Sequence, residues 1–409
     1  MKKFFLLTSF VLLAIGSIQA QKFSDSTEVS LITCSPGKEV YARFGHTAIR
    51  VKDPVNDIDI VFNYGIFDFN TDNFYAKFIK GATDYLLAVY DFKYFLPDYI
   101  ERNSTVWEQK LNFTQAEKEE IINALFINLR PENKTYRYNF IFDNCATRPR
   151  DKILEAFNDS NRVEFKLQEE PLTFREWVEV YVGTNTWLKF GIDMIFGAES
   201  DQLASRKESM FLPEVLMKEL QAATVVSNTG DETRPAVSDT HILVQKRPEE
   251  TKETFLLFRP FPVCTFFLLL GLLACFNSKK FHYLYKTFDS ILYIATGLIG
   301  CIIFYLMFIS IHPVVGENYN ILWLSPLFLI VGIIQWIKPM RLITFCLQCV
   351  NLVFILTAFI IFASSKQALN VAFIPYILLL MARTLNYINT RLKKGIKIYG
   401  EKQIKISSK

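Results

Sequence analysis

The stretch Asn139-Phe-Ile-Phe-Asp-Asn-Cys-Ala-Thr-Arg-Pro-Arg-Asp151 decides how the rest of the chain is interpreted. An aromatic run typical of a strand, residues 136–142, leads into Cys145, and a segment compatible with a helix, 150–157, follows. This order predicts Cys145 near a helix N-terminus, where free backbone N–H groups and the helix dipole favour an anion and lower the pKa of a thiol. The pattern therefore indicates a cysteine nucleophile, provided that a base can take its proton.

Histidine is the expected base, and the chain offers few. It contains 4 His, of which only His46 and His241 precede the apolar second half. His46 lies in the alternating stretch Phe44-Gly-His-Thr-Ala-Ile-Arg-Val51, which predicts a strand. We therefore pair Cys145 with His46, so that the histidine comes first in the chain.

The composition changes along the chain. It begins with two lysines and an apolar run that ends in Ile18-Gln-Ala20, the pattern of a cleaved secretory signal; an uncleaved anchor is the alternative. The predicted order is a signal peptide over 1–20, an exported domain over 21–258, transmembrane helices over 259–390 and a basic cytoplasmic tail over 391–409. The net charge of +4 is small and gives no indication of nucleic-acid binding.

Five apolar segments make up the membrane part, and each is close to the roughly 20 residues that cross a bilayer as a helix. They cover about 261–276, 290–311, 319–337, 342–364 and 368–387. Lysines and arginines follow the first, third and fifth segments, whereas the loop 312–319 has none. Because basic loops stay in the cytoplasm, this pattern places the exported domain and the loop 312–319 outside and the tail inside. The secretory signal independently predicts the same orientation.

The chain contains 7 Cys, most of them in the apolar segments. The Cys346-Leu-Gln-Cys349 pair has no His or carboxylate nearby, so we interpret it as helix packing and predict no metal and no cofactor. Only Cys34 and Cys145 belong to the exported domain. In an oxidising compartment these two could instead form a structural disulfide, which would remove the nucleophile.

The motif Gly45-His-Thr-Ala-Ile-Arg-Val51, followed far downstream by Asp143-Asn-Cys145, resembles the circularly permuted branch of the NlpC/papain-like superfamily, to which lecithin-retinol acyltransferase belongs. A signal peptide, such a domain and a block of membrane helices together are similar to the Lnb-type lipoprotein N-acyltransferases of bacterial envelopes. The resemblance implies an α+β fold: a permuted papain-like exported domain followed by about five transmembrane helices.

The resemblance also implies roles for individual residues. Cys145 would be the nucleophile and His46 its base. A third polar group usually orients the histidine from a neighbouring strand; Asn63 is the candidate because its strand follows across one turn, and Asp59, nearer the turn, is the alternative.

Two sets of residues are candidates for substrate binding. Arg148 and Arg150, just past the cysteine, could meet a phosphate head group or simply form an exposed basic helix start. His312, Asn318 and Asn320 lie in or beside the outward loop and could contact a head group or the catalytic domain. The alternative for this loop is an interfacial segment with aromatic belt residues.

The reaction that the resemblance implies moves an acyl chain from a phospholipid to Cys145 as a thioester, and then to the N-terminal amine of a diacylglyceryl-Cys lipoprotein. The partners are then the phospholipid donor, the lipoprotein acceptor and the membrane. The protein would be a multi-pass protein of the bacterial inner membrane with its catalytic domain on the periplasmic side. A Cys-dependent cell-wall peptidase or amidase, a phospholipase, and a non-enzymatic membrane sensor with a Cys34–Cys145 disulfide are the alternatives.

Overall fold

The computed structural model describes residues 23–67, 73–158, 161–166, 170–227, 232–248, 255–276 and 281–394. The predicted signal peptide and most of the basic tail lie outside these residues. The chain divides into two compact units. The sheet unit comprises 1–69, 84–169 and 210–248, and the helical unit comprises 70–83, 170–209 and 249–409.

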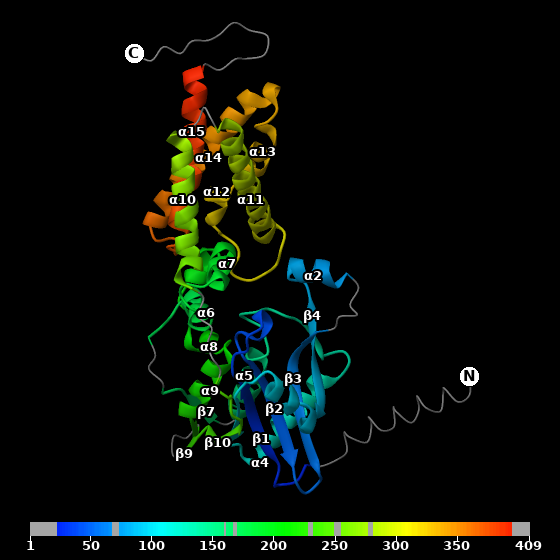
Figure 1. The fold of residues 1–409 in the computed structure, drawn as a ribbon. Helices are drawn as coiled ribbons and strands as arrows, with labels where there is room; N and C mark the ends of the chain where they lie inside the picture. Colours follow the sequence, from blue (N-terminus) through cyan, green and yellow to red (C-terminus); the bar gives the residue numbers. More distant parts are fainter. Residues whose placement is uncertain are drawn as a thin grey trace, which may run out of the picture. The chain divides into compact units, whose positions relative to one another are not determined.

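The sheet unit is built on seven antiparallel strands in the order β10-β5-β1-β2-β3-β4-β6. Their bounds are β1 Glu28–Cys34, β2 His46–Asp53, β3 Ile58–Phe67, β4 Asp84–Asp91, β5 Val106–Leu111, β6 Thr135–Arg137 and β10 Val237–Val244 (Figure 1). The strand predicted around His46 is confirmed, with His46 as its first residue. A small second sheet contains β7 Asn161–Glu164, β8 Thr224–Ser227 and β9 Thr233–Pro235.

Alternation along the strands gives the large sheet two apolar faces. Leu31, Ile49 and Phe62 point to one face and pack with residues of α4 Gln115–Leu129, α5 Thr147–Asn158 and α9 Pro213–Ala222. Ile32 and Ala48 point to the other face and pack with residues of η2 Phe92–Tyr94 and α3 Leu96–Glu101. Helix α4 begins at a capping box, in which Thr114 and Glu117 satisfy each other's backbone N–H groups.

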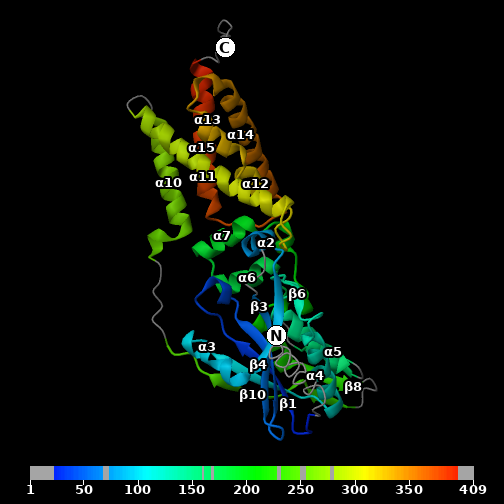
Figure 2. The same cartoon turned by 90° about the vertical axis from the view of Figure 1, so that its right-hand side faces the viewer.

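The helical unit contains the apolar second half of the chain. Its long helices are α10 Pro260–Phe276, α11 His282–Phe308, α14 Arg341–Ala363 and α15 Phe373–Lys394, and α12 Asn320–Trp323 and α13 Leu327–Ile334 complete the bundle (Figure 2). Among the described residues, His282–Phe308 and Lys338–Ala363 are long and apolar enough to cross a membrane. The third predicted segment, 319–337, is broken between α12 and α13, because Pro326 cannot continue the backbone hydrogen bonds of α12.

Two stretches of the predicted exported domain belong to the helical unit. They contain α2 Phe74–Lys80, and α6 Phe174–Val182, α7 Trp187–Ile195, η3 Ala198–Asp201 and α8 Arg206–Ser209. Buried Arg175 forms ion pairs with Asp193 at 2.9 Å and with Asp201 at 2.6 Å. Asp193 and Asp201 also bind Asn370 and the backbone N–H of Ala368, which tie this segment to the start of α15. The predicted span 21–258 is therefore not one compact body.

Candidate functional site

Cys145 stands in a turn whose shape Asn144 fixes. The Asn144 Oδ1 accepts the backbone N–H groups of Ala146 and Thr147 at 2.8 and 2.9 Å, which caps the start of α5. Its Nδ2 donates to the carbonyls of Phe140 and Phe211. All four bonds are made by one buried side chain, so the thiol is held in a defined place at the N-terminus of α5.

The structure corrects two local predictions around this turn. The strand predicted over 136–142 is wrong, because β6 ends at Arg137. The Asn139 Oδ1 accepts the N–H groups of Ile141 and Phe142 and bends the chain into a turn. The helix begins at Thr147 rather than at Arg150, because the Asn144 cap supplies an earlier start.

His46 and Asn63 lie on neighbouring strands and touch. The His46 Nε2 is 2.6 Å from the Asn63 Oδ1, and the Asn63 Nδ2 donates to the Tyr90 hydroxyl at 2.7 Å. The Asn63 oxygen can only accept, so the Nε2 of His46 carries the hydrogen, and the Nδ1 remains for the thiol. Asn63, not Asp59, is therefore beside the histidine, since Asp59 pairs with Arg50 at 2.6 Å.

The Cys145 thiol and the His46 imidazole form a hydrogen-bonded pair. Burial raises the pKa of Cys145, but the charge and hydrogen bond of His46, with the backbone N–H groups of Thr47 and Cys145, lower it below its ordinary value. Burial lowers the pKa of His46, but the charge and hydrogen bond of Cys145 and the Asn63 hydrogen bond raise it above its ordinary value. Opposite shifts of this kind favour a thiolate–imidazolium pair.

The Tyr136 hydroxyl lies in the neighbourhood of Cys145. A Cβ atom at Gly65 would be 3.5 Å from the Cys145 Cβ and 3.9 Å from the Tyr136 Oη, so both atoms border one small space. Tyr136 is 6% exposed, and its hydroxyl has no hydrogen-bond partner among the described residues. Burial and then the charge of Cys145 raise the pKa of Tyr136, so its hydroxyl keeps its proton.

Replacing Asn63 by alanine is expected to lower kcat about 10- to 100-fold, the effect of losing one hydrogen bond to a charged group. Because that bond raises the pKa of His46, the alkaline limb of the pH–rate profile should move to lower pH. Asn63→Asp keeps an acceptor beside the imidazolium and should retain most of the activity. An Asn63→Ala enzyme with the rate and pH profile of the wild type would contradict this role.

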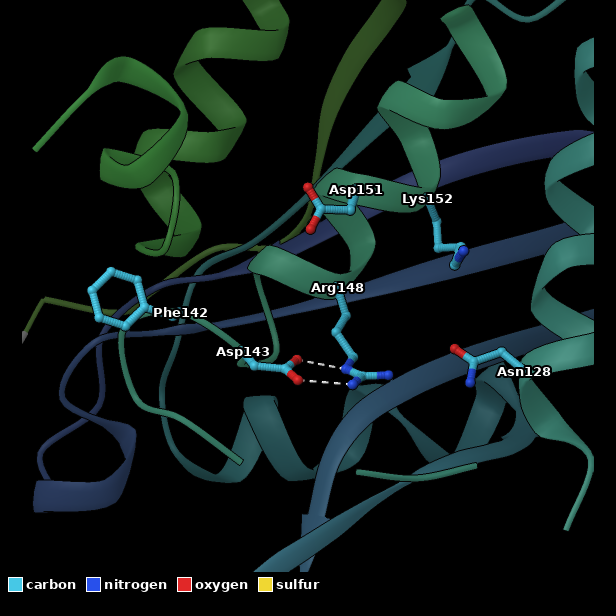
Figure 3. A pocket seen from close by; sticks show the side chains of 6 residues that line it. All are labelled: Asn128, Phe142, Asp143, Arg148, Asp151 and Lys152. Carbon is cyan, nitrogen blue, oxygen red and sulfur yellow. Dashed lines mark hydrogen bonds and ion pairs between the residues drawn. The ribbon is translucent and has the colours of Figure 1, made fainter. Parts of the chain in front are cut away.

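The two predicted arginines have different surroundings. Arg148 pairs with Asp143 through two hydrogen bonds, at 2.6 and 2.8 Å, and its guanidinium covers the Tyr136 ring at 3.8 Å. Arg148 also borders a hollow of about 320 Å³ (Figure 3). The lining residues are Asn128, Phe142, Asp143, Arg148, Asp151 and Lys152. Arg150 is buried against Asp151 and does not line this hollow, so the alternative of an exposed basic helix start does not apply to it.

The residues expected on the outward loop are held inside the helical unit. Asn318 and Asn320 are each 1% exposed. Asn318 donates to the carbonyl of Met194, and Asn320 donates to that of Asp193. These bonds fix the loop to the end of α7, so we propose a structural role for both asparagines in place of substrate contact. His312 lies 3.2 Å from the carbonyl of Ile79, also within the helical unit.

Cys34 and Cys145 are both free, so the structure does not contain the alternative disulfide. Cys34 is fully buried opposite His46 in the β1–β2 register, and burial raises its pKa. A thiol in this environment is protonated and unreactive. Of the two exported cysteines, only Cys145 has the partners of a nucleophile.

Comparison with known families gives two matches. A model of the Lnb N-terminal periplasmic domain matches residues 17–180, and a model of the Lnb transmembrane domain matches residues 250–395. Comparison with curated proteins and with solved structures gives no match. The fold and the two family matches together identify this protein as a membrane protein whose N-terminal part is a periplasmic α+β domain. The chain belongs to the Lnb family of lipoprotein N-acyltransferases.

Proposed function

We propose that this protein transfers an acyl chain from a phospholipid through a Cys145 thioester to the N-terminal amine of a diacylglyceryl-Cys lipoprotein. The observation that carries the proposal is the Cys145–His46–Asn63 arrangement within the periplasmic domain of an Lnb chain. A thioester is a suitable intermediate because it is reactive toward amines. One thiol that serves two successive half-reactions predicts ping-pong kinetics.

In the first half-reaction, the Cys145 thiolate attacks the ester carbonyl of the phospholipid. The tetrahedral intermediate collapses as the C–O bond breaks, and the His46 imidazolium gives its proton to the departing lysophospholipid oxygen. In the second, the lipoprotein amine attacks the thioester. Neutral His46 takes the amine proton, the C–S bond breaks, and the thiolate–imidazolium pair is restored with the amide product.

The tetrahedral oxygen of both half-reactions needs hydrogen-bond donors. The backbone N–H of Cys145 helps to lower the pKa of the thiol, and we assign it as one donor. The Tyr136 hydroxyl is the second candidate, because it is buried in the neighbourhood of Cys145 with its hydrogen-bond capacity unused among the described residues.

Tyr136→Phe keeps the ring and removes this hydroxyl, and is expected to slow acylation of Cys145 about 100-fold, the cost of losing one oxyanion donor. Alkylation of Cys145 by iodoacetamide forms no oxyanion and should keep its rate. Both rates are measured by intact mass spectrometry. Tyr64→Phe is the matched control, since the Tyr64 hydroxyl already donates to Asn128 at 2.8 Å. If Tyr136→Phe lowered the acylation and the alkylation rates equally, the hydroxyl would act by positioning the thiol and not by binding the oxyanion.

The contacts within the helical unit support the predicted multi-pass orientation. The periplasmic family match includes Lys80 and Arg175. The Lys80 carbonyl accepts the N–H of Ile311, directly after α11, and Arg175 binds Asp201, which binds Ala368 directly before α15. The loop after α11 and the loop before α15 therefore contact residues that belong to the periplasmic family match. We propose five membrane passages with these loops on the periplasmic side and the tail in the cytoplasm.

The proposed reaction is tested by incubating the detergent-solubilised protein with phospholipid and measuring its intact mass. An added acyl mass that hydroxylamine removes is expected. Addition of a diacylated lipopeptide should then discharge the acyl chain onto its amine. Discharge onto water alone would favour a phospholipase, and a free, reactive Cys145 without any acyl adduct would favour a peptidase or amidase.

A further inference from the structure

Helix α2, in the connection between β3 and β4, presents an apolar face to the outside. Tyr75, Phe78 and Ile79 follow one another at i, i+3 and i+4, which places them on one side of the helix. They are 81%, 49% and 56% exposed. Among the described residues, this short helix therefore exposes three neighbouring large apolar side chains. An exposed apolar surface of this kind marks an interaction site.

The backbone holds α2 at the outer end of α11. The Lys80 carbonyl accepts the N–H of Ile311 at 2.8 Å, and the His312 Nε2 is 3.2 Å from the Ile79 carbonyl. Gly81 ends the helix with a φ of 76°, and a Cβ atom there would lie only 3.0 Å from the backbone nitrogen and ring of His312. Figure 1 shows α2 beside the loop that follows α11.

With α11 as one of the membrane passages proposed above, this attachment places α2 at the level where α11 leaves the bilayer. Helix α11 is long and apolar enough to cross a membrane and ends at Phe308. Its last turn and the residues after it expose apolar side chains. These are Phe304 at 47%, Phe308 at 64%, Ile309 at 49% and Ile311 at 51%. The apolar face of α2 is therefore attached to a surface that already belongs to the lipid.

We propose that α2 is an interfacial helix, which inserts the face of Tyr75, Phe78 and Ile79 into the outer leaflet of the membrane. Lys77 and Lys80, in its last turn, then reach the lipid phosphates. Short helices with aromatic and aliphatic residues on one face and lysines beside it bind membranes in this way. Tyrosine is also enriched at the depth of the head groups.

The proposed membrane contact of α2 does not depend on the reaction, but α2 follows β3, the strand that carries Asn63. The connection that holds α2 begins after Phe67, at the end of β3, and β3 carries Asn63. The periplasmic domain therefore has its own membrane contact, in addition to the transmembrane helices that follow it in the chain.

Photo-crosslinking tests the proposal in the full-length protein. p-Benzoylphenylalanine is placed at position 75 or 78, and the protein is reconstituted in nanodiscs of phosphatidylethanolamine and phosphatidylglycerol. Val55 is the matched control site, because it is 68% exposed but lies in the β2–β3 turn, at the opposite end of β3. After irradiation, lipid adducts at 75 and 78 are expected at about ten times the yield at 55, since only the former would lie in the acyl region.

Equal adduct yields at 75, 78 and 55, or no lipid adduct at 75 and 78, would overturn the proposal. A crosslink from 75 or 78 to a second copy of the chain would assign the face to protein contact instead. As a second measurement, Phe78→Cys should react with a membrane-impermeant maleimide several-fold more slowly than Val55→Cys in nanodiscs, and equal rates would also contradict insertion. Neither readout requires acyl transfer, so failure of the proposed reaction would leave this result unchanged.

Discussion

Replacement of Cys145 by alanine is expected to reduce acyl transfer at least about 1,000-fold and to abolish the hydroxylamine-labile acyl adduct. Loss of a nucleophile that forms a covalent intermediate has effects of this size or larger, because the remaining groups act only through binding and oxyanion stabilisation. The side chain is small and its packing contribution is minor, so the thermal unfolding of the variant should stay close to that of the wild type. Transfer is measured as mass gain of a diacylated lipopeptide.

Cys34→Ala is the matched control for this variant. Cys34 lies in the same sheet, is also free, and is more deeply buried than Cys145. Its replacement should leave the acyl adduct and the transfer rate intact and cost only the packing of one sulfur atom. A Cys145→Ala protein that retains transfer would refute every thiol mechanism proposed above, including the hydrolytic alternatives.

Replacement of His46 by alanine is expected to reduce transfer about 100- to 10,000-fold, the usual contribution of a general acid–base. It should also change the titration of Cys145. His46 supplies the charge and the side-chain hydrogen bond that lower the pKa of Cys145 in the wild type, whereas burial, which raises that pKa, remains. The thiolate should therefore form only at higher pH in the variant. The pH at which iodoacetamide alkylates Cys145 at half its maximal rate is the measurement.

In the wild type, the lowered pKa of Cys145 and the raised pKa of His46 set a window for the ion pair. Transfer should rise as pH increases through the pKa of Cys145 and fall as it increases through that of His46. His241→Ala is the control, since His241 pairs with Glu108 elsewhere in the same sheet. An unchanged alkylation profile in His46→Ala would show that His46 does not activate the thiol.

The sequence predicts those features of the site that depend on a short stretch of residues, namely the strands of His46 and Asn63 and the helix start at Cys145. Alternation of apolar residues around His46 predicts a strand, and one turn later the next strand brings Asn63 beside it, because antiparallel neighbours are joined by short connections. Helix-start chemistry places Cys145 before α5. These relations depend on residues close in sequence, apart from the pairing of His46 with Cys145, which was inferred from the small number of histidines before the apolar second half and agrees with the family resemblance.

The residues that sequence did not identify depend on contacts between distant segments. Tyr90 binds Asn63 across the β3–β4 pair, and Tyr136, on the edge strand β6, lies near Gly65 and Cys145. Asn144 could have been found, because an asparagine close before a helix is a common cap, and α5 begins three residues after it. Nothing in the sequence near Asn318 and Asn320 indicates that both amides bind the end of α7, more than a hundred residues earlier.

The interleaving of the two units has a consequence for biosynthesis. Strand β10 completes the sheet only after residue 244 has emerged, whereas the hydrogen bonds of Asp201 and Asp193 to Ala368 and Asn370 form only after these still later residues are made. Because a chain is synthesised from its N-terminus, the segment 170–209 is made before these partners. A fragment cut at 248 would keep a complete large sheet but carry an unfinished ion cluster. We therefore expect the segment 170–209 to complete its hydrogen bonds only together with the start of α15.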